Sequence, residues 1–247
     1  MSRQVRLLGL SMLAVSAVGV VMSASASAHA YFVCKEGGTE KYETSLCAKK
    51  QETGKFSFLP VEKAETYKVE GKSSGIIEVE NMEPAFLGNP RTGIECKKDK
   101  LVGEIGAGES KRDVFTFEEC ALYLAQSHRR IAQNNCSVPN IPSTDLKSSL
   151  ITGTGSGPED EFEPESGTTM FEITLTGGQC VWAGKYSLTG KQSCSLPEGF
   201  AGKVEHEIVC SPTGSSLDFQ AVPSNGPAKL FMDTTVKLSA GSAWGAE

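Results

Sequence analysis

The sequence predicts an all-β, disulfide-stapled protein, built as an antiparallel sandwich or barrel-like domain with at most one short helix. Three observations support this fold class: apolar and polar residues alternate over many short segments, glycine and proline separate those segments, and the chain has eight cysteines. Strict alternation is typical of strands with one buried face. Many short strands separated by turns are typical of sandwiches and barrels.

The first thirty residues have the three parts of a secretory signal peptide. A basic start is followed by an uncharged stretch over residues 7–22 and by a small, alanine-rich end. Sites of the A-x-A type end at Ala28 and at Ala30, and cleavage after Ala30 is slightly favoured. The apolar stretch is shorter than the roughly 20 residues of a spanning helix. We therefore expect residues 1–30 to be removed from a secreted, extracellular protein.

Residues 31–60 form the next predicted unit, a small N-terminal cystine loop. Cys34 and Cys47 flank a stretch rich in glycine, lysine and glutamate. Thirty residues are too few to bury a core of their own. A disulfide across a loop of this length stabilises it by about 3 kcal/mol in the loop-entropy model.

Residues 61–247 are predicted to form one all-β domain of about ten to twelve strands. Alternation is clear at Tyr67–Val69, at Ile77–Val79 and at Phe171–Leu175. A longer segment places Leu230, Met232, Val236 and Leu238 on one face and Asp233, Thr235 and Lys237 on the other. These four segments are the most clearly predicted strands.

Two segments depart from the alternating pattern. Residues 118–132 contain an Ala-Leu-Tyr-Leu-Ala run with few β-branched residues, which slightly favours a helix over an extended excursion. Residues 152–165 combine a Ser/Thr/Gly tract with several acidic residues and are predicted to be a long solvated loop. The acidic run lacks the alternating ligands and central glycine of an EF-hand, so no calcium site is expected there.

The cysteines are predicted to form structural disulfides. No two of them are closer than 13 positions, which excludes the close pairs of zinc sites and of redox motifs. Local loop closure favours Cys34–Cys47 most strongly, and Cys120–Cys136 and Cys194–Cys210 come next. A Cys96–Cys180 bridge then follows by elimination.

The charge balance excludes several classes of partner. The chain has 24 basic and 30 acidic residues, a net charge of −6, and removing residues 1–30 makes it more acidic because two arginines are lost. An acidic chain is a poor nucleic-acid binder, since phosphate contacts need clustered Lys and Arg. We expect no nucleic-acid partner and no transmembrane segment after signal cleavage. The expected partner is an extracellular protein or glycan.

No motif in the chain supports catalysis. Residues 71–75 match G-x-S-x-G, but a strand-like segment follows where a nucleophile elbow needs a helix, so residues 72–75 are interpreted as a hairpin turn. His206 shares a face with apolar residues and is expected to be packed, while His128 lies in a small basic segment. We assign no catalytic residue, no metal ligand and no cofactor, and we predict that the protein is not an enzyme.

Trp182 and Tyr186 are the candidate binding surface. They lie four positions apart in a predicted strand, so both rings share one face. Two such rings can form a stacking platform for a ligand. Two residues of the hydrophobic core would give the same pattern, and this interpretation is favoured.

Several longer stretches resemble uncharacterised secreted, cysteine-containing all-β proteins that occur as multiple paralogues in soil actinobacteria. The matching stretches are residues 31–34, 42–47, 93–98, 103–105, 115–120, 141–147, 162–167 with Phe171, 180–190, and 236–241 with Trp244. The chain departs from this pattern at Ala121–Asn134 and at Cys194 and Cys210, which look like an added pair. The resemblance implies a secreted β protein and carries over no activity or catalytic residue.

Together these observations predict a secreted, non-catalytic binding or structural protein of the extracellular space or cell surface. A secreted hydrolase is the first alternative, because catalytic triads are spatial and sequence alone does not exclude one. A secreted inhibitor or competition factor is the second, and only the density of disulfides favours it.

Overall fold

The computed structural model describes residues 29–73, 77–81, 91–126, 129–153, 157–196, 202–220 and 225–247. These residues form strands, turns and bends without any helix, and the sheets are antiparallel. The predicted all-β fold class is confirmed. Within the described ranges, no helix has the length and apolarity that a membrane crossing requires.

The described residues form seventeen strands, more than the number predicted. They are β1 (Tyr31–Glu36), β2 (Phe56–Pro60), β3 (Tyr67–Ser73), β4 (Ile77–Asn81), β5 (Arg91–Ile105), β6 (Glu109–Gln126), β7 (Arg129–Ala132), β8 (Ile141–Pro142), β9 (Leu146–Ile151), β10 (Glu159–Pro164), β11 (Thr169–Leu175), β12 (Gly184–Thr189), β13 (Gln192–Ser195), β14 (Glu205–Ser215), β15 (Leu217–Gln220), β16 (Asn225–Leu238) and β17 (Trp244–Ala246). The four segments with clear alternation lie in β3, β4, β11 and β16, as predicted.

The larger sheet closes on itself. Its order runs β16-β14-β13-β10-β9-β6-β5-β3, and β3 pairs back onto β16 from Val69↔Leu238 to Lys72↔Thr235. Eight strands therefore form a closed ring, so each of them has a neighbour on both sides. This arrangement corresponds to the barrel-like alternative of the predicted fold.

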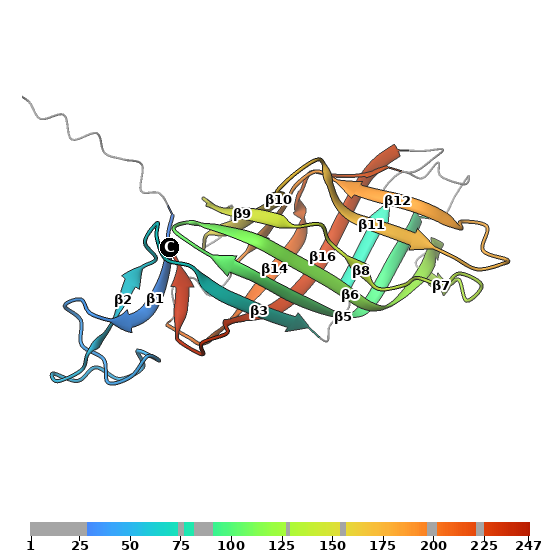
Figure 1. The fold of residues 1–247 in the computed structure, drawn as a ribbon. Helices are drawn as coiled ribbons and strands as arrows, with labels where there is room; N and C mark the ends of the chain where they lie inside the picture. Colours follow the sequence, from blue (N-terminus) through green and yellow to red (C-terminus); the bar gives the residue numbers. More distant parts are fainter. Residues whose placement is uncertain are drawn as a thin grey trace, which may run out of the picture.

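The longest strands continue beyond this ring. Strands β5, β6 and β16 have 15, 18 and 14 residues and run the length of the domain (Figure 1). The N-terminal half of β16 lies beyond the ring and pairs with β4 and β15. From β15 the sheet continues through β12 to β11. Strands β3 and β4 pair in succession with β5 in the same direction. The hairpin turn predicted over residues 72–75 is therefore wrong, and residues 74–76 lie outside the described ranges.

The interior is filled by the inward faces of these strands. In β16 the alternating residues Leu230, Met232, Val236 and Leu238 are buried, as the sequence pattern predicts. Aromatic side chains pack across strands: Phe117 stacks on Phe171 at 5.0 Å between ring centroids, and Phe115 meets Phe162 edge-on at 5.3 Å. Aromatic pairs of this kind add to the stabilisation from buried area.

A smaller sheet joins the two ends of the described chain. Its order is β17-β1-β2, and beyond it Ala30 and Glu247 exchange two backbone hydrogen bonds of 2.9 and 3.0 Å. Figure 1 shows the C-terminus beside β1 at one end of the closed sheet. We call residues 29–61 and 243–247 the terminal module. The segment predicted as a separate N-terminal unit is therefore completed by the last strand of the chain.

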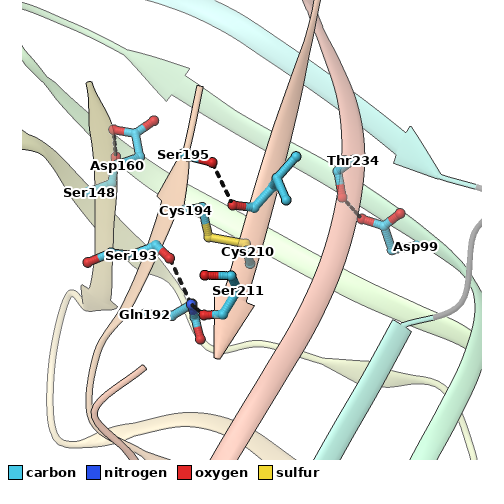
Figure 2. The surroundings of a disulfide bond; sticks show 11 residues. Asp99, Ser148, Asp160, Gln192, Ser193, Cys194, Ser195, Cys210, Ser211 and Thr234 are labelled. Carbon is cyan, nitrogen blue, oxygen red and sulfur yellow. Dashed lines mark hydrogen bonds between the residues drawn. A yellow bond between two sulfur atoms is a disulfide. The ribbon is translucent and has the colours of Figure 1, made fainter. Parts of the chain in front are cut away.

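All eight cysteines form disulfides, and two of the four predicted bridges are confirmed. Cys34–Cys47 and Cys194–Cys210 are present, and Figure 2 shows the second joining neighbouring strands. The predicted Cys120–Cys136 and Cys96–Cys180 bridges are wrong. The structure instead has Cys96–Cys120 and Cys136–Cys180. Cys96 lies directly opposite Cys120 in the β5–β6 register, so strand pairing, and not loop length, decides which cysteines meet.

Two local predictions are also wrong. The helix favoured over residues 118–132 is absent, because this segment forms the end of β6 and then β7, with β6 paired to β5 on its other side. Sheet pairing here overrides a weak helix preference. The loop predicted over residues 152–165 includes β10, where Asp160 and Phe162 point inward between half-buried glutamates.

Candidate functional site

The structure does not bring the predicted aromatic pair to the surface. Trp182 and Tyr186 are 9% and 8% exposed and belong to the main core cluster. Trp182 lies in the turn before β12, and the Tyr186 hydroxyl donates to the Trp182 carbonyl at 2.6 Å. The rings therefore stabilise the start of β12 and do not form an exposed stacking platform.

Of the two histidines weighed for catalysis, the structure describes His206, which is also part of the interior. His206 on β14 is 3% exposed, its Nε2 lies 2.6 Å from the Trp244 carbonyl oxygen, and its ring meets the Trp244 indole edge-on. This confirms the expectation that His206 is packed. His128 lies outside the described residues.

The unexpected feature is a network of buried polar side chains at the end of the closed sheet covered by the terminal module. The Tyr31 hydroxyl donates to Asp160, with distances of 2.5 and 2.7 Å to its two oxygens. Ser148 donates to Asp160 Oδ1 at 3.0 Å and lies 2.7 Å from Ser110 Oγ, and Ser110 in turn contacts Asp113 Oδ2. We call these five residues the carboxyl network.

An irregularity in β6 directs Asp113 inward. The register between β5 and β6 shifts between Val102 and Glu104, and Arg112 adopts a left-handed conformation at φ 54°. Bulges of this kind re-aim a side chain relative to its neighbours in the strand. Asp113 then lies over Gly103, where a Cβ atom would overlap its Oδ1. Gly103 therefore provides the space that the Asp113 carboxyl occupies.

Regular strand alternation positions the other members. In β9, Leu146, Ser148 and Leu150 all point inward, and in β10 Asp160 does so with Phe162. Asp160 pairs with Cys194 of β13, and Figure 2 shows its hydrogen bond to Ser148 near the Cys194–Cys210 disulfide. Tyr31 enters from β1 of the terminal module and is 1% exposed.

Burial changes the acidity of the network. It raises the pKa of Asp113 to about 8, although hydrogen bonding from Ser110 acts in the opposite direction. Burial also raises the pKa of Asp160 to about 6, against the lowering effect of the hydrogen bonds from Tyr31 and Ser148. Burial and the neighbouring Asp160 raise the pKa of Tyr31 well above its usual value. Tyr31 therefore remains a donor at neutral pH.

Carboxyl groups with raised pKa values are candidates for functional sites. An adjacent space of about 20 Å³, lined mainly by apolar side chains including Val69, Ile208 and Val236, has room for about one water molecule. The carboxyl network can thus bind and release protons, but it has no room for an organic substrate.

No sequence motif predicts this network. Asp160 stands in an acidic run whose composition is typical of a solvated loop, and only the spacing of Asp160 and Phe162 at period two indicates a strand. Asp113 has no local signal, because a bulge determines its direction. Tyr31 belongs to the stretch that carries the family resemblance and begins the predicted N-terminal unit, and neither feature predicts a buried hydrogen bond.

The outer surface offers a second, weaker feature. A depression of about 330 Å³ lies over β3, β5, β14 and β16 and is lined by Lys72, Lys100 and Lys237 together with glutamates. Val102 lies at this depression and is 55% exposed. Mixed charges around one exposed apolar side chain suit a polar partner.

Within the described ranges, no group of three or more His, Cys, Asp or Glu side chains is arranged to hold a metal ion. Comparison of the chain with protein-family models, with curated protein sequences and with solved structures finds no match.

Proposed function

We propose that the protein is secreted and acts outside the cytoplasm as a non-catalytic binding or structural protein. The observation that carries this proposal is that all eight cysteines are paired in four disulfides. Such a set forms and persists in an oxidising compartment and is rare in the cytosol. The signal-peptide pattern of residues 1–30 supports the same compartment.

The contacts of His29 and Ala30 favour cleavage of the leader after Ala28. Ala30 exchanges two backbone hydrogen bonds with Glu247, and His29 Nε2 lies 2.9 Å from Thr152 Oγ1. A chain that begins at Tyr31 would lose these contacts. The mass of the secreted protein tests this point, because cleavage after Ala28 leaves His29 as its first residue.

A binding role is supported by the closed, cross-linked sheet, which presents a rigid outer surface. The charged depression around Val102 is the surface that we propose for an extracellular protein or glycan partner. The secreted hydrolase is less well supported, because His206 is buried against Trp244 and the two carboxyls with raised pKa values are enclosed.

Expression of the full chain in a secreting bacterial host tests the proposal. We expect the protein in the culture medium, with no thiol alkylated before reduction and eight alkylated after it. We also expect co-sedimentation with an insoluble cell-wall fraction. The double variant K72E/K237E should reduce this binding, while the control K185E, an exposed charge reversal on β12, should not.

Retention in the cytoplasm with free thiols would contradict the proposed compartment. Turnover of ester, peptide or glycoside substrates by the purified protein would contradict a non-catalytic role. Equal binding by K72E/K237E and K185E would exclude the depression as the binding surface.

A further inference from the structure

The carboxyl network contains more hydrogen-bond contacts than its hydroxyl groups can supply with hydrogens. Its contacts join Tyr31 to Asp160, Ser148 to Asp160, Ser110 to Ser148, and Ser110 to Asp113. Each hydroxyl carries one hydrogen, and an ionised carboxylate carries none. The three hydroxyl groups therefore supply three hydrogens for four contacts.

With both carboxyls ionised, one contact is left without a hydrogen. Tyr31 and Ser148 then donate to Asp160, and Ser110 donates to Asp113. No hydrogen remains between Ser110 Oγ and Ser148 Oγ, although these atoms are only 2.7 Å apart. Two buried oxygens at this distance repel each other unless one donates to the other.

One added proton completes the network. With a proton on Asp113, its hydroxyl donates to Ser110, Ser110 donates to Ser148, and Ser148 donates to the ionised Asp160, which also accepts from Tyr31. With the proton on Asp160 instead, the hydrogen bonds between the two carboxyls run in the opposite direction: Asp160 donates to Ser148, Ser148 to Ser110, and Ser110 to Asp113. Each of the four contacts then again has one hydrogen. We propose that Asp113 and Asp160 form a buried site that binds one proton, and that this proton helps to hold the terminal module on the closed sheet.

The surroundings favour one bound proton over none at neutral pH. Asp113 and Asp160 are 2% and 4% exposed, and two buried carboxylates would repel each other with little solvent to screen them. The raised pKa values of both groups agree with this, and the higher pKa of Asp113 places the proton there at neutral pH.

The charged and titratable groups packed around the network do not neutralise a second charge. From β1 it receives the Tyr31 phenol, and from β5 the Glu104 backbone N–H, which bonds to Asp113. Glu165 accepts from the Arg112 backbone N–H and adds negative charge near Asp113. His206 of β14 lies against Trp244, which like Tyr31 lines the adjacent space.

Tyr31 couples the proton to the terminal module. It belongs to β1, which pairs with β17 and β2, and its hydroxyl reaches Asp160 on β10 of the closed sheet. Loss of the shared proton leaves an uncompensated buried charge beside this contact. Deprotonation should therefore loosen the terminal module before it affects β5 and β6.

Carbon-detected NMR titration of the two carboxyl groups in the oxidised, mature protein tests the site. We expect two coupled steps, one with its midpoint above pH 7 and one near pH 6, and we describe them as belonging to the pair. In D113N the upper step should disappear. In Y31F the Asp160 titration should move upward by about one pH unit, because its charged form loses a donor.

Hydrogen exchange tests the coupling to the terminal module. Between pH 6 and pH 9, after correction for the intrinsic rate, protection of the Ala30 and Glu247 amides should fall at least tenfold. Amides in the centre of β5 and β6 should change less. In D113N this difference should vanish, because an Asn amide group donates to Ser110 at every pH. Asp99 on β5 is a second buried carboxyl, which accepts a hydrogen bond from Thr234. The control D99N removes this carboxyl and should keep the pH dependence.

A double variant separates loss of the proton site from loss of folding. In D113N/D160N each amide supplies both an N–H donor and a carbonyl acceptor at every pH, so the network closes without a bound proton. The variant should fold, and its protection of the Ala30 and Glu247 amides should not change between pH 6 and pH 9. Carboxyl midpoints of both groups below pH 5 would overturn the proton site. A uniform loss of protection across the whole protein would overturn its coupling to the terminal module.

Discussion

Replacing Gly103 by Ala tests how the fold directs Asp113 into the interior. A Cβ atom at position 103 would overlap Asp113 Oδ1 and lie 2.9 Å from its carboxyl carbon. The nearest backbone atom of Asp113, its Cα, would be 3.2 Å away, so the carboxyl has to move while the strand can stay. Gly103→Ala is therefore expected to expel the carboxyl from its site.

The expected cost follows from the contacts that the carboxyl loses. Asp113 bonds to Ser110 and to the Glu104 N–H, and leaving a buried polar group without a partner costs about 1–3 kcal/mol. Loss of two such contacts gives a destabilisation of roughly 2–6 kcal/mol. Reduced freedom of the unfolded chain offsets about 0.4–1 kcal/mol of this.

Urea unfolding of the oxidised protein at pH 6 measures this cost. In a D113A background the obstacle is gone, and Gly103→Ala should then stabilise the protein by about 0.4–1 kcal/mol. Gly178 has open space around it, so G178A serves as a control for this effect on the unfolded chain alone. Equal costs of G103A with and without Asp113 would refute the role assigned to Gly103.

Three further predictions concern the buried network, the disulfides and the core. Because the folded-state pKa of Asp113 is raised to about 8, its stabilising contribution is complete below about pH 4 and is lost as the pH rises through 8. The free energy of unfolding in urea should be lower at pH 8.5 than at pH 5.5. The difference is limited to about 1.4 kcal/mol for each pH unit over which Asp113 loses its proton. In D113N the free energy of unfolding should depend less on pH. Removing the Cys96–Cys120 bridge as C96A/C120A should lower the stability measured in thermal unfolding by about 3 kcal/mol. A peptide map of the unaltered protein without reduction should recover the peptides containing Cys96 and Cys120 joined to each other. Tyr186→Phe removes the hydrogen bond to the Trp182 carbonyl and should lower the free energy of unfolding by about 1 kcal/mol. An unchanged free energy of unfolding would show that this bond does not stabilise the fold.

The strands with regular alternation were predictable from the sequence. In β16 and β11, apolar residues occupy most of the alternate positions that become the buried face, and Thr234 is the polar exception in β16. In residues 118–132 this pattern is missing, because Leu122 and Tyr123 are adjacent and both buried. Only pairing with β5 and β7 shows that the segment is a strand.

The disulfides show the same limit. Loop closure correctly predicted Cys34–Cys47, because both cysteines lie in one short segment. It failed for Cys120, whose nearest cysteine along the chain is Cys136 but whose cross-strand neighbour is Cys96. The entropy of closing a loop changes slowly with its length, so the register of the strands outweighs it.

By itself, the sequence determined the all-β class, the strands with clear alternation and the presence of a cystine framework, because these depend on local periodicity and composition. Only the tertiary structure decided that the sheet closes through β3 and β16, which cysteines face each other, and that Tyr31, Asp113 and Asp160 meet inside. The closure of the sheet and the Tyr31–Asp160 contact bring together residues more than a hundred positions apart, and a bulge in β6 turns Asp113 inward. A local sequence pattern does not predict these long-range contacts, because they depend on the register of the paired strands and on the closure of the sheet.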